Sequence, residues 1–440
     1  MQNSGIILGG GVTGLAAGMV SGLPVFEARQ NPGGICCSYY VRPGEKTRLP
    51  LPPDDGEVYR FEIGGGHWIF GGDPLVLRFI RELTGVSSYQ RESSVFFPES
   101  GLRVPYPLQN NLRFLDPLLA RSALEEIVDA TKNPTRPGTM GAWLHGSFGP
   151  TLCEKFFEPF HDLYTAGLWK EIAPQDSYKS PVNTTQMIRG YSSESSSVGY
   201  NVSFLYPPHG LDDLTRKMGR SCDIRYGKTV VGIDLEKKRI RFSDGSEVDY
   251  PFLISTLPLN RMVDMTGLKI DCRTDPHTSV LVTNIGAIRG PNCPEDQWLY
   301  VPRSKARFHR VGFYSNVDVS FLPSSTRNRR DRVSIYVERA YQPGQRPDPS
   351  GIDSVSTQIV EELREWGWTG DVEVVDPTWI DVAYTWSWPD SQWKIKAMRA
   401  LENHGIFQVG RYARWIFQGI ADSIRDGFIA GAAAMRIDSK

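Results

Sequence analysis

A glycine run near the start of the chain has the residues needed to hold a pyrophosphate. An apolar segment, Ile6 to Leu8, leads directly into Gly9-Gly10-Gly11-Val12-Thr13-Gly14. In a Gly-x-Gly-x-x-Gly pattern the first glycine permits a tight turn, the second lets the backbone approach a phosphate, and the third lets a helix pack on the strand. Glu27 ends the next apolar segment, 18 residues after Gly9, close to where a carboxylate that binds ribose is expected. These residues predict a dinucleotide site.

Two further glycine-rich segments extend this site. Gly33-Gly34 follows Glu27 closely, and plain NAD folds lack such a pair. Gly64-Gly65-Gly66-His67 would let the backbone lie against a flat ring, with a histidine placed to hydrogen-bond to it. The alternative is a histidine that packs in a glycine turn and has no redox role. The glycine pair resembles that of the glycine-pair FAD superfamily, which includes amine oxidases, protoporphyrinogen oxidases and UDP-galactopyranose mutases.

Within that superfamily the chain resembles the UDP-galactopyranose mutases, particularly the eukaryotic type. The Gly64 to His67 stretch is one match, and Val104 to Asn111 is similar, almost residue for residue, to the family's Pro-Tyr-Pro-φ-Gln-Asn-Asn run. The other matches follow in the family's order: Trp143 to Trp169, Val202 to Leu214, Gln297 to Pro302 with Phe308 to Arg310 and Tyr314 to Asn316, and Gly410 to Trp415.

The resemblance implies an FAD-dependent intramolecular transferase with no net oxidation. In these mutases reduced FAD acts through N5 as a nucleophile on the anomeric carbon of a nucleotide sugar, and the sugar recloses between its pyranose and furanose forms. The protein would contribute positioning and charge stabilisation. The expected partners are a nucleotide sugar and an external reductant, such as NAD(P)H, that primes the flavin.

The resemblance also assigns residues to the site. His67 is expected against the flavin, Arg310 on the substrate diphosphate, and Arg411 between flavin and phosphates, and these are the expected catalytic residues. The expected cofactor-binding residues are Gly9, Gly11, Gly14, Glu27, Gly33, Gly34, Gly66, His67, Val230, Gly410, Arg411, Asp422 and Ser423. The expected substrate-binding residues are Tyr106, Asn110, Trp169, Trp298, Tyr300, Arg310, Trp388 and Phe417.

Some positions depart from the mutase pattern. Trp388 and Phe417 occupy positions that align with two tyrosines that bind the diphosphate in the family, and neither carries a hydroxyl. The arginine of the substrate lid is missing, and only Lys179 or Arg189 could substitute for it. Each charge-assisted hydrogen bond lost would cost about 1.5–3 kcal/mol. The resemblance to the mutases therefore supports the fold of this chain more strongly than it supports the substrate.

Two other classes of function stay open. Trp386, Trp388, Trp393 and Trp415 could form an aromatic pocket for a cation or an apolar substrate, as in a flavin oxidase or dehydrogenase. They could equally pack against helices. No lysine lies in the flavin-side motif common among amine oxidases, and the mutase-like segments would be unexplained. A flavin-bound scaffold without turnover is the third class, because cofactor binding does not prove catalysis.

These residues require an α/β fold with a discontinuous, Rossmann-type FAD-binding domain. We expect that domain to comprise residues 1–71, 205–275 and 396–440, with a mostly helical insertion at 72–204 and a mixed, β-rich substrate domain at 276–395. Asp422 and Ser423 are good N-cap residues for a helix of small residues at 428–435, whose N-terminus would face the flavin. Expected helices of the insertion lie at 74–83, 117–130, 139–148 and 153–160, and expected strands of the substrate domain at 280–285, 298–301, 311–314 and 333–339.

The composition agrees with a large globular enzyme. A chain of 440 residues is long enough for about two or three domains, and its net charge of −1 gives no electrostatic reason to expect nucleic acid or membrane partners. The four arginines of Arg327 to Arg332 fit a solvated turn. The six cysteines lack metal-binding spacing, which favours free thiols in a cytoplasmic protein. Ser192 to Ser197 fits a mobile loop, no apolar stretch is long enough to span a membrane, and the oligomeric state stays open.

Overall fold

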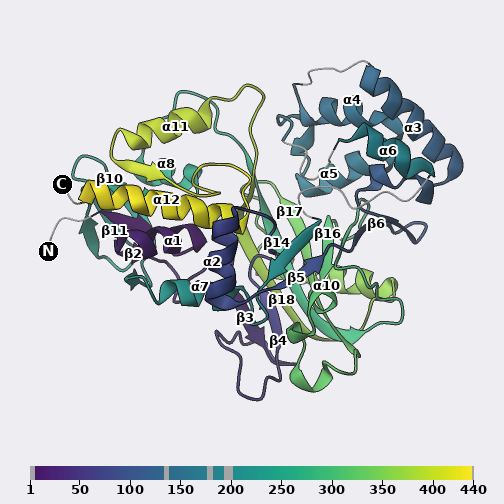
Figure 1. The fold of residues 1–440 in the computed structure, drawn as a ribbon, viewed down its shortest axis with the longest axis horizontal. Helices are drawn as coiled ribbons and strands as arrows, with labels where there is room; N and C mark the ends of the chain where they lie inside the picture. The colour runs from purple at the N-terminus through teal and green to yellow at the C-terminus, as the bar shows by residue number, and fades with distance from the viewer. Residues whose placement is uncertain (1–4, 133–137, 176–181, 193–201, 439–440) are drawn as a thin grey trace.

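The computed structural model describes residues 5–132, 138–175, 182–192 and 202–438. Figure 1 shows three groups of elements: an α/β layer that contains both chain ends, a large twisted sheet beside it, and a bundle of helices at one corner. The expected lysine at 179 and most of the expected serine loop, 193–197, lie outside the described residues. No helix of the described part is long and apolar enough to cross a membrane.

A five-stranded parallel sheet carries the dinucleotide motif. Its strand order is β19-β13-β1-β2-β9, and the strands come from three separated parts of the chain: β1 (Ile6–Leu8), β2 (Val25–Phe26), β9 (Ile224–Arg225), β13 (Leu253–Ser255) and β19 (Ile406–Gln408). Helices α1 (Val12–Ser21) and α12 (Ile420–Asp438) pack against each other beside this sheet. A Cβ atom at Gly427 would lie 2.3 Å from the carbonyl oxygen of Thr13, so a glycine is needed for the two helices to approach this closely.

A seven-stranded sheet forms the second layer. Its order is β18-β14-β17-β16-β15-β6-β7, with β6 (Ser93–Phe97), β7 (Leu102–Pro105), β14 (His277–Arg289), β15 (Trp298–Tyr300), β16 (Arg310–Phe313), β17 (Arg332–Tyr341) and β18 (Thr369–Thr385). One face buries Ile285, Phe313 and Ile335 with Ile359 and Leu363 of α10 (Pro349–Glu365). Side chains alternate between faces along a strand. The opposite face of the sheet therefore carries Arg310, Tyr336 and Glu338.

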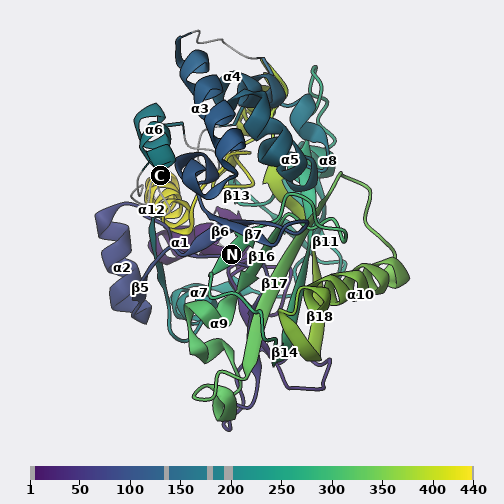
Figure 2. The ribbon, with the colours of Figure 1, turned by 90° about the vertical axis from the view of Figure 1, so that its right-hand side faces the viewer.

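The helical bundle is made by α3 (Pro117–Lys132), α4 (Met140–Leu152), α5 (Glu158–Tyr164) and α6 (Thr184–Ser192), and Figure 2 shows it at one end of the large sheet. A π-helical turn at Cys153–Phe157 joins α4 to α5, where the sequence predicts a separate helix at 153–160. The other elements are α2 (Pro74–Thr84), β3 (Ser38–Val41), β4 (Tyr59–Glu62), β5 (Ser87–Gln90), β8 (Ser203–Tyr206), α7 (Leu211–Gly219), β10 (Val230–Asp234), β11 (Arg239–Phe242), β12 (Glu247–Asp249), α8 (Leu259–Thr266), α9 (Tyr314–Val317) and α11 (Trp393–Glu402).

The α/β class and the Rossmann-type layer with helical and β-rich additions are confirmed. The start of the last helix is not where the sequence suggests. Helix α12 begins at Ile420, so Asp422 and Ser423 lie in its first turn and neither is the N-cap. A single uninterrupted helix forms because Ser423 N–H donates to Gly419 O at 3.0 Å, which starts helical hydrogen bonding earlier than the side-chain types indicate.

Candidate functional site

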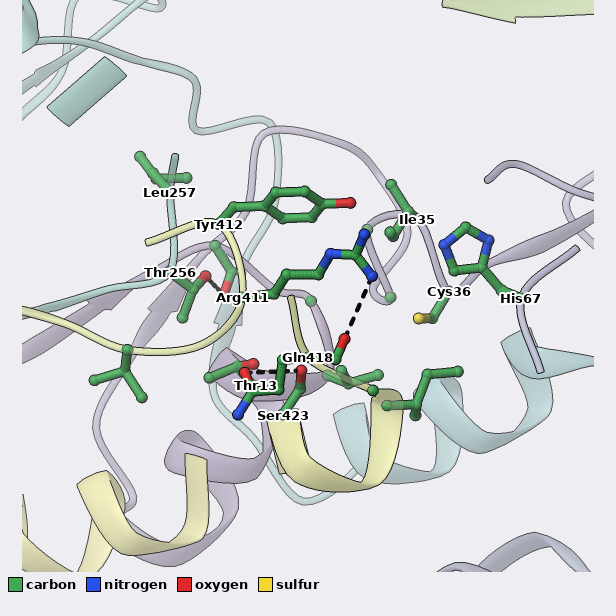
Figure 3. A pocket seen from close by; sticks show the side chains of 18 of the residues that line it. Thr13, Ile35, Cys36, His67, Thr256, Leu257, Arg411, Tyr412, Gln418 and Ser423 are labelled. Atoms are coloured by element: carbon green, nitrogen blue, oxygen red, sulfur yellow. Dashed lines mark hydrogen bonds between the residues drawn. The ribbon is translucent and has the colours of Figure 1, made fainter. Parts of the chain in front are cut away.

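A cavity of about 230 Å³ opens at the carboxyl ends of β1 and β2, beside the N-termini of α1 and α12. Figure 3 shows its side chains converging from the first glycine turn, from the Ile35-Cys36 segment, and from the chain before and within α12. The lining residues are Gly9, Gly11, Val12, Thr13, Glu27, Gly33, Gly34, Ile35, Cys36, His67, Thr256, Leu257, Val409, Arg411, Tyr412, Gln418, Gly419, Ile420 and Ser423.

The glycine turn is built as the sequence pattern requires. A Cβ atom at Gly14 would lie 1.9 Å from the carbonyl oxygen of Gly9, so only glycine lets α1 leave the strand at this angle. The Glu27 carboxylate is buried and accepts hydrogen bonds from Gly10 N–H at 2.7 Å and from Arg29 N–H at 2.8 Å. The backbone of Gly33 donates to Gly10 O at 2.8 Å, which joins the glycine pair to the first turn. This cradle fits a pyrophosphate and a ribose.

His67 lies where this cavity meets a second, smaller one. His67 is partly exposed, but its Nδ1 is buried and has no hydrogen-bond partner among the described residues. Burial, and then the positive charge of Arg411, lower the pKa of His67 from 6.5 to about 4. The ring is therefore neutral near pH 7, and a buried polar atom without a partner points to a ligand that supplies one.

Arg411 is a cation held by neutral groups. Its guanidinium donates to Gln418 O at 3.3 Å and to Ala383 O at 3.4 Å, and it lies 4.8 Å from the ring centroid of Phe417. In Figure 3 its head points toward Ile35, Cys36 and His67. No carboxylate pairs with it within the ranges that the structure describes. Its charge is therefore available to an anionic ligand.

The smaller cavity, about 30 Å³, shares Ile35, His67, Arg411 and Tyr412 with the first. Its remaining lining residues are Gly64, Val280, Val282, Glu338, Ile380, Ala383 and Tyr384. The two cavities therefore form one site, bounded by the glycine loop on one side and by the large sheet on the other.

Strand register brings a charged row to this cavity. Tyr300 of β15 lies opposite Arg310 of β16, and Arg310 lies opposite Glu338 of β17. Arg310 Nη2 donates to Glu338 Oε1, while Tyr384 Oη donates to Glu338 Oε2 at 3.3 Å. Burial opposes ionisation of Glu338, but Arg310 and His309 outweigh it and hold the pKa of this carboxyl well below its usual range. The result is a buried ion pair, in which Arg310 Nε keeps no partner among the described residues.

A second row, beside the first, needs a glycine. Trp298 lies opposite Gly312, and Gly312 lies opposite Tyr336. A Cβ atom at Gly312 would lie 2.0 Å from Tyr336 Cζ, and one at Gly66 would lie 2.1 Å from the Tyr336 hydroxyl oxygen. Both glycines therefore make room for the Tyr336 ring, which joins the sheet to the loop that carries His67.

Aromatic rings line the way from the cavity toward the helical bundle. Tyr384 packs on Tyr164 at 4.8 Å between ring centroids, Tyr164 on Phe160 at 5.6 Å, Phe160 on Tyr300 at 5.4 Å, and Tyr300 on Tyr106 at 4.7 Å. Two residues expected at the substrate, Tyr106 and Tyr300, belong to this run. The side-chain amide of Asn110 and the indole N–H groups of Trp169 and Trp298 are buried without partners in the described part of the chain.

The structure brings together some of the expected site residues and separates others. Of the expected cofactor residues, the main cavity is lined by Gly9, Gly11, Glu27, Gly33, Gly34, His67, Arg411 and Ser423. Gly14, Gly66, Val230, Gly410 and Asp422 do not line it. Gly14, Gly66 and Gly410 instead allow close packing, Val230 lies in β10, and Asp422 pairs with Arg425 at 3.7 Å.

The aromatic cage of the oxidase alternative does not form; the tryptophans pack in the core, as the other interpretation of these residues allows. Trp386, Trp393 and Trp415 are buried in hydrophobic clusters, and no tryptophan lines either cavity of the site. Trp388 also lies outside both linings, because its indole N–H donates to Thr274 O at 2.9 Å and Arg273 stacks on its ring. Phe417 also lies outside both linings, and the guanidinium of Arg411 lies over its ring. Arg189 is exposed on α6, away from both linings.

Sequence reasoning did not identify Glu338, Tyr384, Tyr412, Gln418 or Cys36 as part of the site. Glu338 had a detectable signal, because its carboxylate directly follows a mostly apolar run, Val333 to Val337. Tyr384 is the last residue but one of a 17-residue strand that the sequence does not predict, so nothing local assigned it to the cavity. Tyr384 supplies a phenolic hydroxyl to the smaller cavity, which Trp388 does not line.

Comparison with known proteins agrees with this geometry. The model of the family described as flavin containing amine oxidoreductase matches residues 18–277. The structure of a reduced UDP-galactopyranose mutase superposes with a TM-score of 0.83 at 20% identity, covering 100% of this chain and 96% of that one. A CLA-producing fatty acid isomerase from P. acnes gives 0.60 at 13% identity, and a putrescine oxidase bound to putrescine gives 0.57 at 14%, each covering 99% of both chains. The fold is therefore shared from end to end with these proteins.

Proposed function

Because this chain belongs to the family of flavin containing amine oxidoreductases, we propose that it is a flavin-dependent isomerase that interconverts the pyranose and furanose forms of a nucleotide sugar without net redox change. The observation that carries the proposal is that Glu338, paired with Arg310 in the row Tyr300-Arg310-Glu338, lines the same cavity as His67 and Arg411. The full-length likeness to a reduced UDP-galactopyranose mutase supports it.

FAD is the cofactor of this chain. The residues present fit it. The glycine turn exposes backbone N–H groups where a pyrophosphate would lie, and Glu27 is fixed beside Gly10 for a ribose. The unpartnered Nδ1 of His67 lies at the opposite end of the same cavity, where the ring system would reach. When reduced, the flavin would supply a nucleophilic nitrogen for the anomeric carbon of the sugar.

Arg411 and Arg310 would make different contributions to binding of the substrate diphosphate. Arg411 carries a charge that no described carboxylate offsets, so we assign to it the main contact with the diphosphate. The charge of Arg310 is largely offset by Glu338, but its unpartnered Nε–H can still donate. Trp298 and Tyr300, two residues apart on one strand, would border the nucleotide from the same side.

His67 and the aromatic run would prepare the site for sugar chemistry. A neutral imidazole can hydrogen-bond to the cofactor without adding positive charge beside Arg411. The rings of Tyr384, Tyr164 and Phe160 keep bulk water from that side of the cavity. Exclusion of water strengthens the charge interactions of Arg411 with a substrate.

A second candidate is an FAD-dependent oxidoreductase that acts on a small molecule. The observation that favours it is Glu338, a buried carboxylate on the wall of the flavin-side cavity, which would suit a cationic amine. A putrescine oxidase has the same overall fold. The absence of tryptophan from both cavity linings of the described structure removes one support for this alternative.

An anaerobic assay separates the two candidates. Purified holoenzyme, oxidised or chemically reduced, is incubated with a panel of nucleotide sugars, and products are resolved by chromatography while the flavin spectrum is recorded. We expect isomerised sugar only with reduced enzyme and a flavin that stays reduced. Bleaching of the oxidised flavin by a substrate, with no isomerised product, would support the oxidoreductase instead.

A variant of Arg310 tests whether this residue contacts the substrate. Arg310→Ala should raise KM for the nucleotide sugar about tenfold or more, the loss of one charge-assisted hydrogen bond, while FAD remains bound. Arg303→Ala is the matched control, because Arg303 precedes the same strand, is half exposed, donates to Glu154 O at 3.0 Å and forms only a solvent-exposed ion pair with Glu99 in the described structure. Unchanged KM in Arg310→Ala would remove Arg310 from the substrate site.

A further inference from the structure

A third cavity, of about 190 Å³, lies outside the flavin site. It is lined by Arg289, Glu295, Ser315, Asn316, Val317, Val319, Leu322, Arg330 and Arg332, none of which lines either flavin-side cavity. Arg332 begins β17 and lies six residues before Glu338, a separation of about 20 Å along the strand. In Figure 2 the helix α9, which supplies three of the lining residues, lies at the end of the large sheet opposite the helical bundle.

The lining is strongly positive. It contains three arginines and a single carboxylate, that of Glu295, whose side chain is 78% exposed. The basic run Arg327 to Arg332, which the flavin chemistry does not use, supplies two of these arginines. Positive side chains around a concave surface concentrate anions there.

Two of the arginines are held rigidly. Arg289 donates to Asn316 Oδ1 at 3.1 Å, to Glu295 Oε1 at 2.7 Å, and to two backbone carbonyls. Arg332 donates through Nε to both oxygens of Glu373 at 3.0 Å and through Nη1 to Asp331 O at 3.4 Å. Their guanidinium groups are mostly buried, with 18% and 22% of the side chains exposed. The cavity is therefore preorganised before any ligand arrives.

Three donors of the cavity remain available. Arg330 forms no hydrogen bond and no ion pair with any residue that the structure describes, and Arg332 Nη2 has no partner there either. Ser315 Oγ accepts from Ser334 N–H at 3.1 Å, which leaves its own hydroxyl hydrogen free to donate. Two guanidinium groups and a hydroxyl facing one cavity match the acceptor oxygens of a tetrahedral dianion.

We propose that this cavity is a second ligand site, which binds a small phosphoryl dianion, either inorganic phosphate or the phosphate of a small phosphate monoester. The charge of the lining selects an anion, and the guanidinium of Arg330, Nη2 of Arg332 and the hydroxyl of Ser315 together offer donors to several acceptor oxygens. The cavity, of about 190 Å³, has room for a phosphate group.

Isothermal titration of the FAD-loaded protein tests the proposal. Inorganic phosphate and, in a separate arm, glycerol phosphate are titrated in a buffer free of other multivalent anions. We expect one site per chain and weaker binding at high salt. Tighter binding of the ester than of phosphate would identify the phosphate monoester as the ligand, and the reverse would identify free phosphate.

Variants locate the site. Arg330→Gln should weaken phosphate binding about tenfold or more, as expected for the loss of a charge-assisted contact. Arg329→Gln removes the same charge from the neighbouring residue, which does not line the cavity, and should leave the affinity within about twofold. Ser315→Ala gives a second, uncharged test and should weaken binding measurably.

Three results would overturn the proposal. They are the absence of saturable binding by the unmodified protein, equal affinity in Arg330→Gln and Arg329→Gln, and loss of binding in Arg411→Ala but not in Arg330→Gln. The last result would place the anion in the flavin site. Because the assay reads binding alone, it is independent of the proposed sugar chemistry.

Discussion

Removal of the Glu338 carboxylate should destabilise the protein strongly, because it leaves the Arg310 cation buried without its partner. Glu338 is 2% exposed and the Arg310 side chain is 14% exposed, so water cannot replace the lost charge. Breaking a buried pair by removal of one partner costs about 3–5 kcal/mol, whereas exposed pairs are worth about 1 kcal/mol or less. We expect Glu338→Gln to lower the free energy of unfolding by about 3–5 kcal/mol.

A double-mutant cycle isolates the pair. Arg310→Met, Glu338→Leu and the double variant are compared with the unmodified protein by urea unfolding of the FAD-loaded protein, followed by tryptophan fluorescence. Each single variant leaves one buried charge, but the double variant leaves none and fills the space with apolar atoms. The double variant should therefore be more stable than either single variant. Lys305→Met, with Lys305 in an exposed pair with Glu365, is the control and should change stability by about 1 kcal/mol or less.

The cycle can refute the reasoning. If the effects of the two single variants add to that of the double variant within about 0.5 kcal/mol, the residues do not interact energetically. The buried ion pair would then not organise the flavin-side wall, and the row across β15, β16 and β17 would lose its assigned role.

The remaining predictions concern His67 and the glycine before Arg411. Because the pKa of folded His67 is about 4 and its ordinary value is 6.5, the unfolded chain binds the extra proton first, so stability should fall as pH drops from about 6.5 to 4. The neutral form of His67 therefore contributes about 3 kcal/mol to the free energy of unfolding above this pH range. Urea unfolding of FAD-free protein between pH 6.5 and 4 should show a shallower dependence of stability on pH for His67→Gln. The control variant His404→Gln should keep the slope of the unmodified protein. Gly410→Ala should weaken FAD binding about tenfold or more, because Gly410 has φ of +89° and a Cβ there would lie 2.6 Å from Thr13 Oγ1. Gly344→Ala, at φ of +78° with no atom within 4 Å, carries the backbone strain without the clash and should bind FAD normally in a fluorescence titration; equal affinity of both variants would contradict the packing argument.

The parts of the site predicted from sequence are those that depend on short stretches of chain. The turn from Gly9 to Gly14, the approach of Glu27 to Gly10, and the glycine loop before His67 are set by backbone conformations and spacings within a few residues to a few tens of residues. The FAD cofactor and the Rossmann-type layer were predictable for the same reason, because the glycine motifs and the acidic residue that follow short apolar strands can be recognised in the sequence.

Other features depended on contacts between distant segments. The tryptophans at 386, 393 and 415 had the composition of an aromatic cage, but tertiary packing placed them in hydrophobic clusters. Helix α12 began before the residues that looked like its cap. No local pattern distinguishes a tryptophan that lines a cavity from one that fills a core, since the same apolar surface suits both.

By itself, the sequence determined the dinucleotide cradle and the family of the fold, because glycine geometry and hydrophobic periodicity are local. Only the tertiary structure decided that Glu338 neutralises Arg310, that Tyr384 reaches the flavin-side cavity, and that Arg330 and Ser315 share the third cavity. The physical reason is strand register. Residues 300, 310 and 338 become neighbours only when three strands align to bury one face, and that alignment minimises the free energy of the whole sheet, not of any one strand.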